Sequence, residues 1–448
     1  MAAVQEIKPS PVPASATQGG DVRERWLWTE PAVWTDRMLT ALEQGVKGGV
    51  WFSLMDKVFA GSNLEASYGK VAANEGAPGV DHVTVEAFGT ALEENVARLT
   101  AALRDGSYEP QAIRRAYIPK PGSNEQRPLG IPTIRDRVVQ GAVRHAIEPI
   151  FEWEFATSSY GFRPGKGCKD ALRRVDDLLK QGYVYVVDAD LKSYFDTIPH
   201  DRLLSRLRER IADGRVLRLI ESFLKAGILD GLEEWEPEAG APQGAVLSPL
   251  LSNIYLNPLD HQMAAQGFEM VRYADDFVIL CRSQAQAEQA LALVRQWCEA
   301  ASLVLHPNKT KIVDVRTEGF DFLGYHFQTT RQGRLTRWPR KKSLDKLKDA
   351  LRSKTKRSDG RALVCIINDV NRTLRGWFGY FKHSCRSTFR PIDGWVRMRL
   401  RSILRQRLHG AGRGRGRDHQ RWPNSFFAAQ GFFSLEAAFV AAGQSPRG

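Results

Sequence analysis

The chain has 448 residues, 43% of them hydrophobic and 26% charged, which is ordinary for a globular protein and leaves room for about two to four domains. Its net charge is +13, and because no run of about 18 apolar residues occurs, a membrane span is excluded. Five widely separated cysteines form no Cys-x-x-Cys pair, which argues against a zinc site and a disulfide framework, and the N-terminus lacks a secretion signal.

The N-terminal part alternates between polar, helical and turn-forming segments. Residues 1–25 are rich in Pro, Ala, Ser and Gly and are predicted to be disordered. Residues 26–68 have a helical pattern whose aromatic side chains are expected in a core. A turn over Gly76–Asp81 precedes a predicted helix over Val85–Leu103.

A β-hairpin is predicted next, because residues 114–122 read as a short strand that ends in a Pro/Gly turn and are followed by residues 126–132. This hairpin carries Lys120 and Arg127 at its mouth. Two cations on a rigid hairpin suit a triphosphate, while solvated surface charge is an alternative of equal weight.

The middle of the chain places two aspartates at the end of an apolar strand. An amphipathic helix is predicted over residues 135–155, and a basic, glycine-rich turn over Tyr160–Gly167 precedes a helix over residues 169–180. Backbone amides at such a helix start can hold phosphate, which is a weak signal alone. In the strand over residues 183–191, Asp188 and Asp190 share a face. Metal ligation is one reason for two such acids, and a single acid paired with a nearby Lys or Arg is the alternative.

The second acidic segment is Tyr273-Ala274-Asp275-Asp276, which lies between two apolar, β-branched runs. This pattern predicts a β-hairpin with both carboxylates at its tip. A shared divalent metal would remove their repulsion, although a solvated Asp-Asp turn fits the tetrapeptide equally well. Upstream, a Pro/Gly turn over residues 241–251 starts a helix that runs to about residue 266, and Gln243 stands in that turn, where its amide can reach a base edge or a sugar.

The composition changes after residue 330. A helix is predicted over residues 284–301 and an aromatic strand-turn element over residues 320–327. Residues 331–448 then hold 28 Lys and Arg against 7 Asp and Glu, whereas the first 330 residues hold 36 against 44. Helices are predicted over residues 343–353 and 392–408. Residues 370–381 between them mix aromatic side chains with arginines, and Gly and Arg alternate over residues 412–417. Charge of one sign interleaved with aromatic residues fits a surface for single-stranded or structured RNA.

Taken together, these motifs resemble those of a reverse transcriptase of the kind encoded by bacterial group II introns, with its attached maturase region. The resemblance covers nearly the whole chain from about Leu54. It is carried by Gly79-Val80-Asp81, Ile118-Pro119-Lys120-Pro121, Arg127-Pro128-Leu129-Gly130, Tyr160-Gly161-Phe162-Arg163-Pro164-Gly165, Asp188-Ala189-Asp190-Leu191-Lys192, Pro242-Gln243-Gly244, Tyr273-Ala274-Asp275-Asp276, Phe322-Leu323-Gly324, Leu374-Arg375-Gly376-Trp377 and Arg421-Trp422-Pro423-Asn424. His82 and Ala245 stand where the family has glycine.

The resemblance implies an α+β fold: a right-hand polymerase with fingers, a palm built on an antiparallel sheet and a helical thumb, followed by a basic helical maturase region. The implied divisions are a disordered N-terminus over 1–25, an N-terminal extension and fingers over 26–185, a palm with the acidic hairpin and primer grip over 186–330, a thumb and maturase domain over 331–410, and a basic C-terminal tail with a short DNA-binding region over 411–448. No Cys-pair/His endonuclease module follows the maturase region, so second-strand cleavage by this chain alone is in doubt.

The same resemblance assigns roles to residues of this chain. It implies that Asp190, Asp275 and Asp276 are catalytic, that these three and Leu191 bind two Mg²⁺ ions, and that Asp190 rather than Asp188 is the ligand because of its distance to Phe195. The implied nucleotide-binding residues are Lys120, Arg127, Phe195, which would discriminate against ribose, and Gln243. The primer grip would be Phe322, Leu323 and Gly324. The implied RNA-binding residues are Arg163, Lys341, Lys342, Arg375, Trp377, Arg413, Arg415 and Arg417.

The implied function is RNA-directed DNA synthesis by a cytoplasmic bacterial protein, together with binding of its own intron RNA to assist splicing and retrohoming. The partners would be an RNA template, a DNA primer, dNTPs, group II intron RNA and target DNA. The sequence leaves the oligomeric state open. Two other functions also remain open at this point: an RNA-binding splicing factor with a vestigial polymerase, and a domesticated reverse transcriptase in phage defence or DNA repair.

Overall fold

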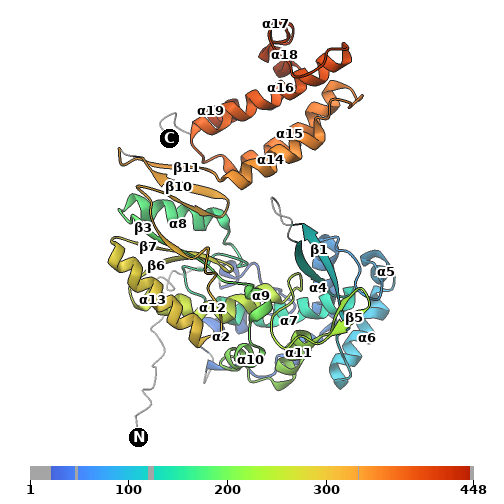
Figure 1. The fold of residues 1–448 in the computed structure, drawn as a ribbon. Helices are drawn as coiled ribbons and strands as arrows, with labels where there is room; N and C mark the ends of the chain where they lie inside the picture. The colour runs from blue at the N-terminus through green and yellow to red at the C-terminus, as the bar shows by residue number, and fades with distance from the viewer. Residues whose placement is uncertain (1–21, 46–48, 120–125, 331, 444–448) are drawn as a thin grey trace.

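The structure is a computed structural model that describes residues 22–45, 49–119, 126–330 and 332–443 (Figure 1). Helices and strands are mixed along the chain, as expected for an α+β protein. The helices of the first half are α1 (Val22–Arg25), α2 (Asp36–Gln44), α3 (Met55–Val58), α4 (Gly61–Ala73), α5 (Val85–Thr90), α6 (Leu92–Asp105), α7 (Ile134–Glu152), α8 (Cys168–Lys180), α9 (Tyr194–Thr197), α10 (His200–Arg208) and α11 (Gly214–Lys225). The later helices are α12 (Ser248–Ala265), α13 (Gln284–Ala300), α14 (Lys341–Lys354), α15 (Leu363–Phe381), α16 (Phe389–Arg407), α17 (Arg417–Arg421), α18 (Asn424–Ala429) and α19 (Leu435–Ala441).

Three sheets are present in the described residues, and each has its own strand order. The first has the order β2-β1-β4-β5 and consists of β1 (Ile113–Pro119), β2 (Gln126–Ile131), β4 (Ile228–Asp230) and β5 (Glu233–Trp235). The second has the order β6-β7-β3-β8 and consists of β3 (Tyr185–Asp190), β6 (Glu269–Tyr273), β7 (Asp276–Cys281) and β8 (Lys311–Asp314). The third has the order β11-β10-β9 and consists of β9 (Phe320–Phe322), β10 (Tyr325–Thr329) and β11 (Leu335–Pro339).

The sheet that contains β3 and β7 is buried on both faces. Alternate residues of β7 enter different cores: Phe277 and Ile279 join the large core that includes α12 and α13, whereas Val278 and Leu280 join a second core formed with α8 and the β9–β10 hairpin. This explains why β7 reads as a continuous apolar run, because a strand covered on both sides has no solvent face. The two acids of β3 and the two acids near β7 are therefore exceptions to an otherwise apolar sheet.

Helix α7 crosses the N-terminal part and is buried almost all round, so the prediction of an amphipathic helix here is wrong. Its polar side chains are buried with partners instead of facing solvent. Asp136 accepts hydrogen bonds from the Tyr108 hydroxyl at 2.6 Å and from the Gln111 amide at 3.0 Å. A polar group is tolerated in a core when its hydrogen bonds are satisfied.

His145 of α7 should make the stability of the fold depend on pH. Its Nε2 lies 2.8 Å from Lys70 Nζ and its Nδ1 lies 2.8 Å from Asn63 Oδ1. Because an ammonium group only donates, Nε2 accepts and the proton sits on Nδ1, so the ring is neutral. Burial, followed by the charges of Lys70 and Arg144, lowers the pKa of His145 to about 3.

The unfolded chain therefore binds a proton on His145 below about pH 6.5 that the folded chain does not bind, and stability falls as the pH decreases through this window. For each pH unit between 6 and 4, we expect the free energy of unfolding of the wild type to fall by up to about 1.4 kcal/mol more than that of His145→Gln. Urea unfolding of both proteins at pH 7, 6, 5 and 4 measures it. A difference that stays constant over this range would contradict the neutral, buried ring.

The C-terminal helices form one unit with its own core. Residues of α14, α15 and α16 pack with Phe427 of α18 and with Leu435 and Phe439 of α19. Asp393, which is buried in α16, caps α19 by accepting hydrogen bonds from the Ser434 hydroxyl and from backbone amides at residues 435 and 436. The predicted boundary at residue 410 therefore divides a shared core, and residues 411–443 are a packed part of the helical unit.

Several predicted boundaries differ from the observed ones for local reasons. Residues 22–25, predicted as disordered, form α1, while residues 1–21 lie outside the described residues. The helix predicted over residues 85–103 is two helices, because Ala91 leaves helical geometry at φ −117° and ψ 39°. Strand β11 pairs with β10, so the predicted division after residue 330 cuts through a sheet. In the described residues, no helix combines the length and apolar character needed to cross a membrane.

Candidate active site

The structure brings the three predicted catalytic aspartates together at one end of the β6-β7-β3-β8 sheet. Strands β3 and β7 are antiparallel, and their register pairs the Cα atoms of Asp190 and Asp276. Strands β6 and β7 form a hairpin in which Tyr273 pairs with Asp276, so that Ala274 and Asp275 make the turn. Ala274 takes a positive φ of 59°, as a tight two-residue turn requires. The backbone positions of three aspartates from two distant segments of the chain thus lie next to each other.

The electrostatics of this cluster show that the carboxylates repel each other. Burial, followed by the charges of Asp188, Asp275 and Asp190, raises the pKa of Asp276 to about 7. Burial also raises the pKa of Asp275, with a further contribution from Asp190, against the lowering effect of Arg127 and Arg272. Closely spaced acids with raised pKa values are typical of sites that bind a cation.

Asp190 has a cationic neighbour from the segment that follows α13. Its Oδ2 lies 2.6 Å from Lys309 Nζ, and its backbone carbonyl accepts a hydrogen bond from the His306 amide at 2.7 Å. In the described residues no group of three or more His, Cys, Asp or Glu side chains is arranged so that it could hold a metal ion. In this arrangement one carboxylate oxygen of Asp190 is engaged by the ammonium group of Lys309.

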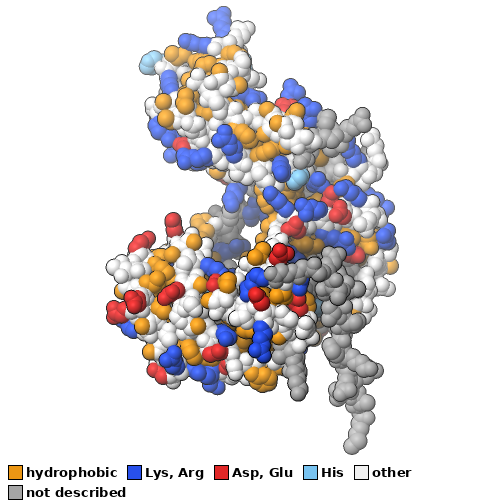
Figure 2. Space-filling view, turned by 180° about the vertical axis from the view of Figure 1, so that it is seen from behind, with side chains coloured by type: hydrophobic (Ala, Val, Ile, Leu, Met, Phe, Trp, Pro, Cys, Tyr) orange, Lys and Arg blue, Asp and Glu red, His pale blue; other side chains and the backbone are white. Residues whose placement is uncertain are grey.

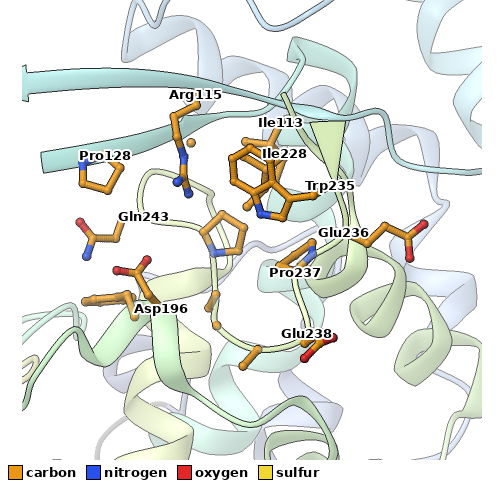
Figure 3. A pocket seen from close by; sticks show the side chains of 16 residues that line it. Ile113, Arg115, Pro128, Asp196, Ile228, Trp235, Glu236, Pro237, Glu238 and Gln243 are labelled. Atoms are coloured by element: carbon orange, nitrogen blue, oxygen red, sulfur yellow. The ribbon is translucent and has the colours of Figure 1, made fainter. Parts of the chain in front are cut away.

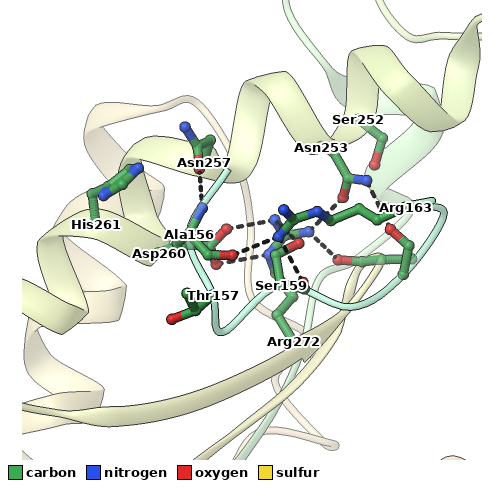
Figure 4. A network of polar contacts seen from close by, with 12 residues as sticks. Ala156, Thr157, Ser159, Arg163, Ser252, Asn253, Asn257, Asp260, His261 and Arg272 are labelled. Carbon is green, nitrogen blue, oxygen red and sulfur yellow. Dashed lines mark hydrogen bonds and ion pairs between the residues drawn. The ribbon is translucent and has the colours of Figure 1, made fainter. Parts of the chain in front are cut away.

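The acidic hairpin is held in place by Arg272, a fully buried residue of β6 (Figure 4). Its guanidinium donates two hydrogen bonds to Asp260 of α12, at 2.8 and 2.5 Å. It also donates to Asn253 Oδ1 at 2.9 Å, to Ser159 Oγ at 2.8 Å and to the Ala274 carbonyl at 2.8 Å. All five guanidinium protons are thereby used. Arg272 thus fixes the carbonyl that immediately precedes Asp275.

The segment over residues 158–163 packs directly against the acidic hairpin. The Tyr160 amide donates to the Arg272 carbonyl at 2.9 Å, and a Cβ atom on Gly161 would lie 2.3 Å from the Ala274 nitrogen, so only glycine fits at this position. The prediction that Arg163 contacts RNA is not supported by its position. Its side chain is buried, pairs with Glu152 at 2.6 Å and donates to the carbonyls of Ala156 and Ser159, so it holds this loop.

A cavity of about 520 Å³ lies beside the predicted nucleotide-binding residues (Figure 3). Phe195 and Gln243 both line it, together with Arg115 of β1 and Trp235 of β5. Figure 3 shows Gln243 and Asp196 on one side of the cavity and Trp235 on the other. The guanidinium of Arg115 lies over the Trp235 ring at 5.2 Å. The cavity is therefore lined by aromatic rings, by the side-chain amide of Gln243 and by the guanidinium of Arg115.

Backbone contacts set the position of Gln243 and Phe195 at this cavity. The Gly130 amide of β2 donates to the Gln243 carbonyl at 2.6 Å, and a Cβ atom on Gly244, whose φ is +107°, would lie 2.5 Å from the Gly130 carbonyl oxygen. The Phe195 carbonyl accepts a hydrogen bond from the Ala241 amide at 2.7 Å. The Pro-Gln-Gly turn is thus clamped between β2 and α9, which explains its glycine.

The predicted β1–β2 hairpin is confirmed, with Ile118 opposite Arg127. Arg127 is exposed at the start of β2, and it is close enough for its charge to lower the pKa of Asp275. This places a cation from the first sheet next to the acidic hairpin of the second. Lys120, the other predicted cation, lies outside the described residues.

The predicted primer-grip residues form the turn between β9 and β10. Phe322 is buried, whereas Leu323 and Gly324 have φ angles of 45° and 85° and make the turn itself. The Leu323 carbonyl accepts a hydrogen bond from the Tyr380 hydroxyl of α15 at 2.7 Å, and the Gly324 carbonyl accepts one from the Arg340 amide at 2.9 Å. The turn is therefore attached to the C-terminal helical unit.

The predicted RNA-binding residues of the C-terminal unit divide into exposed and packed side chains. Six of the seven residues are exposed: Lys341, Lys342, Arg375, Arg413, Arg415 and Arg417. Trp377 is half-buried, with its ring 4.8 Å from that of Phe381, so it packs inside the unit and is a poor stacking platform. On the upper lobe in Figure 2, which the C-terminal helices form, blue Lys and Arg side chains are more prominent than red Asp and Glu side chains, and a hollow lies below the lobe.

Sequence reasoning missed four charged residues at this site. Arg272 and Asp260 form a buried pair, Lys309 contacts Asp190, and the charge of Arg340 lowers the pKa of Asp276. Of these residues, only Arg272 could have been recognised from the sequence. An arginine between Val271 and Tyr273 in an apolar strand needs a buried acidic partner.

Comparison with known proteins identifies this combination of fold and site. The family description "Reverse transcriptase (RNA-dependent DNA polymerase)" matches residues 118–327, and "Group II intron, maturase-specific domain" matches residues 344–422. The chain is 38% identical to protein YkfC of Escherichia coli (strain K12) over 288 residues, which cover 55% of this chain and 75% of YkfC. It is 40% identical to the group II intron-encoded protein LtrA of Lactococcus lactis subsp. cremoris over 196 residues, which cover 43% of this chain and 32% of LtrA.

Among solved structures, the chain is similar to telomerase from Candida albicans, with 13% identity and a TM-score of 0.41 over 71% of this chain and 64% of that chain. It is also similar to a partial Cas6-RT-Cas1–Cas2 complex, with 25% identity and a TM-score of 0.37 over 55% of this chain and 41% of that chain.

The matched domains and the acidic hairpin define a polymerase of the reverse transcriptase class. More specifically, the chain belongs to the reverse transcriptases with a group II intron maturase domain. The predicted family is thus confirmed.

Proposed function

We propose that this chain copies RNA into DNA and binds intron RNA through its C-terminal helical unit to assist splicing and retrohoming. In this proposal the β6-β7-β3-β8 sheet is the palm, the β2-β1-β4-β5 sheet is part of the fingers, and α14–α16 are the thumb. The observation that carries the proposal is the register that sets Asp190 opposite Asp276, one residue from Asp275. Target DNA would be the acceptor during retrohoming.

The aspartate cluster fits the two Mg²⁺ ions that this chemistry needs. Magnesium prefers carboxylate oxygens, and three carboxylates with mutual repulsion are a suitable donor set. Asp190, Asp275 and Asp276 would hold the ions, with Leu191 contributing next to Asp190. When bound, the ions supply Lewis acidity to the primer 3′-hydroxyl and to the leaving pyrophosphate. Asp190 would exchange its contact with Lys309 for this role, which leaves the ammonium group beside the reacting phosphates.

The cavity lined by Phe195 and Gln243 suits the incoming nucleotide. Phe195 lines it and would pack under the sugar, where its ring would clash with a 2′-hydroxyl. Arg127 would neutralise phosphate oxygens, because it is near enough to the aspartates for its charge to influence Asp275. Gln243 would bind a base edge or a sugar with an amide whose backbone is fixed by Gly130. Lys120, Phe322, Leu323 and Gly324 keep their predicted roles in this proposal, toward the triphosphate and the primer.

Phe195 gives a direct test of sugar selection. Replacing Phe195 with Val should remove the clash and lower the preference for dNTP over rNTP by about 10- to 200-fold, the range expected for small steric differences in a pocket. Extension with dGTP and rGTP, compared as kcat/KM, measures this preference. Replacing Tyr194 with Phe is the control, because Tyr194 is buried and donates to the Ser252 carbonyl away from the cavity. Unchanged selectivity in Phe195→Val would reject the assignment.

The proposed activity itself is tested by primer extension. Purified chain, a DNA primer annealed to RNA, dNTPs and Mg²⁺ should yield full-length DNA, and addition of EDTA should stop the reaction. Binding of a structured intron RNA should weaken as salt increases, because Lys and Arg exceed Asp and Glu by 28 to 7 after residue 330. RNA binding without any extension would instead favour a splicing factor with a vestigial polymerase.

A further inference from the structure

A groove of about 420 Å³ lies on the C-terminal helical unit, apart from the aspartate cluster. It is bounded by Trp338 and Pro339 of β11, by Leu344 and Lys348 of α14, and by the start of α16 with Trp395. We call it the Trp338–Trp395 groove. None of the residues with a predicted role lines it, and its volume is within the range of small-ligand sites.

Two half-buried indoles line this groove, and each is in contact with neighbouring side chains. The Trp338 ring lies 5.2 Å from the His326 ring of β10 at an interplanar angle of 35°. The Trp395 ring has the guanidinium of Arg399 at 5.3 Å and that of Arg352 at 5.8 Å. Indoles fixed in this way lose little conformational freedom when a flat ligand stacks on them, which makes them suitable platforms.

Positive charge surrounds these indoles with little acid to balance it. Lys348 lines the groove, and Arg352 pairs with Asp349. Arg399 donates to the Thr355 hydroxyl at 2.6 Å and to its carbonyl at 3.0 Å, which are neutral acceptors. Burial, with the charges of Arg352 and Arg357, lowers the pKa of Arg399. A cluster of cations that repel each other is stabilised by an anion such as a phosphate.

We propose that the Trp338–Trp395 groove binds one unpaired base of single-stranded RNA, with the base against the indoles and its phosphate against Lys348 and Arg352. The proposal rests on the RNA-binding part of the proposed function and names a subsite for it. Apolar walls with a cationic rim match a nucleotide, which is flat and apolar at the base and anionic at the phosphate. A base in a duplex cannot enter, because it is stacked and paired.

The test measures binding of the full chain to a 12-nucleotide single-stranded RNA and to a duplex of the same sequence, by fluorescence anisotropy. We expect Trp395→Ala and Trp338→Ala each to weaken single-strand binding by about 5- to 100-fold, the range for loss of one stacking contact, and duplex binding by less than about threefold. Trp395→Phe should retain most of the affinity, because a phenyl ring still stacks. Lys348→Gln should weaken binding and reduce its salt dependence.

The matched control is Trp153→Ala, because Trp153 is 37% exposed and lies outside the groove. Its single-strand affinity should equal that of the wild type. Thermal melting of every variant detects unfolding, and photocrosslinking of wild-type chain to RNA that carries 5-bromouridine gives a readout without mutation. Crosslinks at Trp338 or Trp395 support the proposal.

Three results would overturn it: unchanged single-strand affinity in both alanine variants, an equal loss for single strand and duplex, or crosslinks confined to other parts of the chain. The first of these would fit a groove that takes a protein segment instead. The binding assay contains neither primer nor dNTP. Its result is therefore independent of whether the chain extends a primer, and a failure of the polymerase proposal would be recognised separately.

Discussion

Asp275→Asn should abolish primer extension while leaving RNA binding within about twofold of the wild type. Asparagine has nearly the shape of aspartate but no negative charge, so the hairpin keeps its fold and loses one of the proposed metal-binding carboxylates. We expect a decrease in kcat on the order of 10³-fold, comparable to the loss of a major electrostatic contribution in an active site. Single-nucleotide incorporation under saturating primer–template measures kcat directly.

Removing this charge should also make the fold more stable. Burial and the charge of Asp190 raise the pKa of Asp275, so the carboxylate is a source of repulsion in the absence of cations. A neutral side chain relieves it, and Asp275→Asn should melt at the same temperature as the wild type or higher when no Mg²⁺ is present. Added Mg²⁺ should then raise the melting temperature of the wild type more than that of the variant.

Asp201→Asn is the matched control for both measurements, because Asp201 is an exposed acid at the start of α10. Its extension rate and its response to Mg²⁺ should equal those of the wild type. Extension by Asp275→Asn at a rate within tenfold of the wild type would reject the proposed role of the aspartate cluster. Loss of RNA binding in that variant would mean that the substitution disturbs the fold, in which case Asp276→Asn repeats the test.

The sequence predicted the acidic hairpin correctly because its signal is local. A two-residue turn between apolar strands needs no information from elsewhere in the chain, and the motif order then located Asp190. The burial of Trp377 and Arg163 was not predicted, for the opposite reason. Whether an aromatic or cationic side chain faces solvent depends on what packs over it, here Phe381 and Glu152, and these neighbours are set by tertiary structure.

The packing of the residues beyond the predicted boundary at residue 410 was not readable from the sequence for the same reason. The Gly-Arg repeat over residues 412–417 has the composition of a flexible tail, yet Gly414 is buried against Arg401, whose guanidinium donates to the Trp422 carbonyl at 2.9 Å. The core of α15 and α16 is then completed by apolar residues after this repeat: Trp422, Phe427, Phe432, Leu435 and Phe439. A run of glycines and arginines does not reveal that later residues return to the same helices.

The largest effect on stability is expected at Arg272 and Asp260, which form an ion pair with both side chains fully buried. Asp260→Leu leaves an uncompensated guanidinium in the core and should lower the free energy of unfolding by about 3–5 kcal/mol. Arg272→Met leaves Asp260 unpaired and removes the donors to Ser159, Asn253 and the Ala274 carbonyl, so it should cost at least as much. Urea unfolding of both single variants at pH 7 gives the two values.

The double variant separates the ion pair from the support of the hairpin. With both charges gone, the double variant should be more stable than the sum of the single effects predicts, by at least about 2 kcal/mol, because no lone charge remains buried. Primer extension should nevertheless stay low. The Ala274 carbonyl still lacks its donor, and Asp275 follows directly after it, so the hairpin tip loses its fixed position.

Arg272→Lys tests whether the charge of Arg272 is sufficient or whether the geometry of its hydrogen-bond donors is also needed. A lysine keeps the charge opposite Asp260 but has three donors on a single nitrogen, and it cannot replace five donors spread over a planar group. We therefore expect intermediate stability together with low extension. If the double variant extended primers at the wild-type rate, Arg272 would serve only the fold. If the two single effects on the free energy of unfolding were simply additive, the buried pair would not act as a unit.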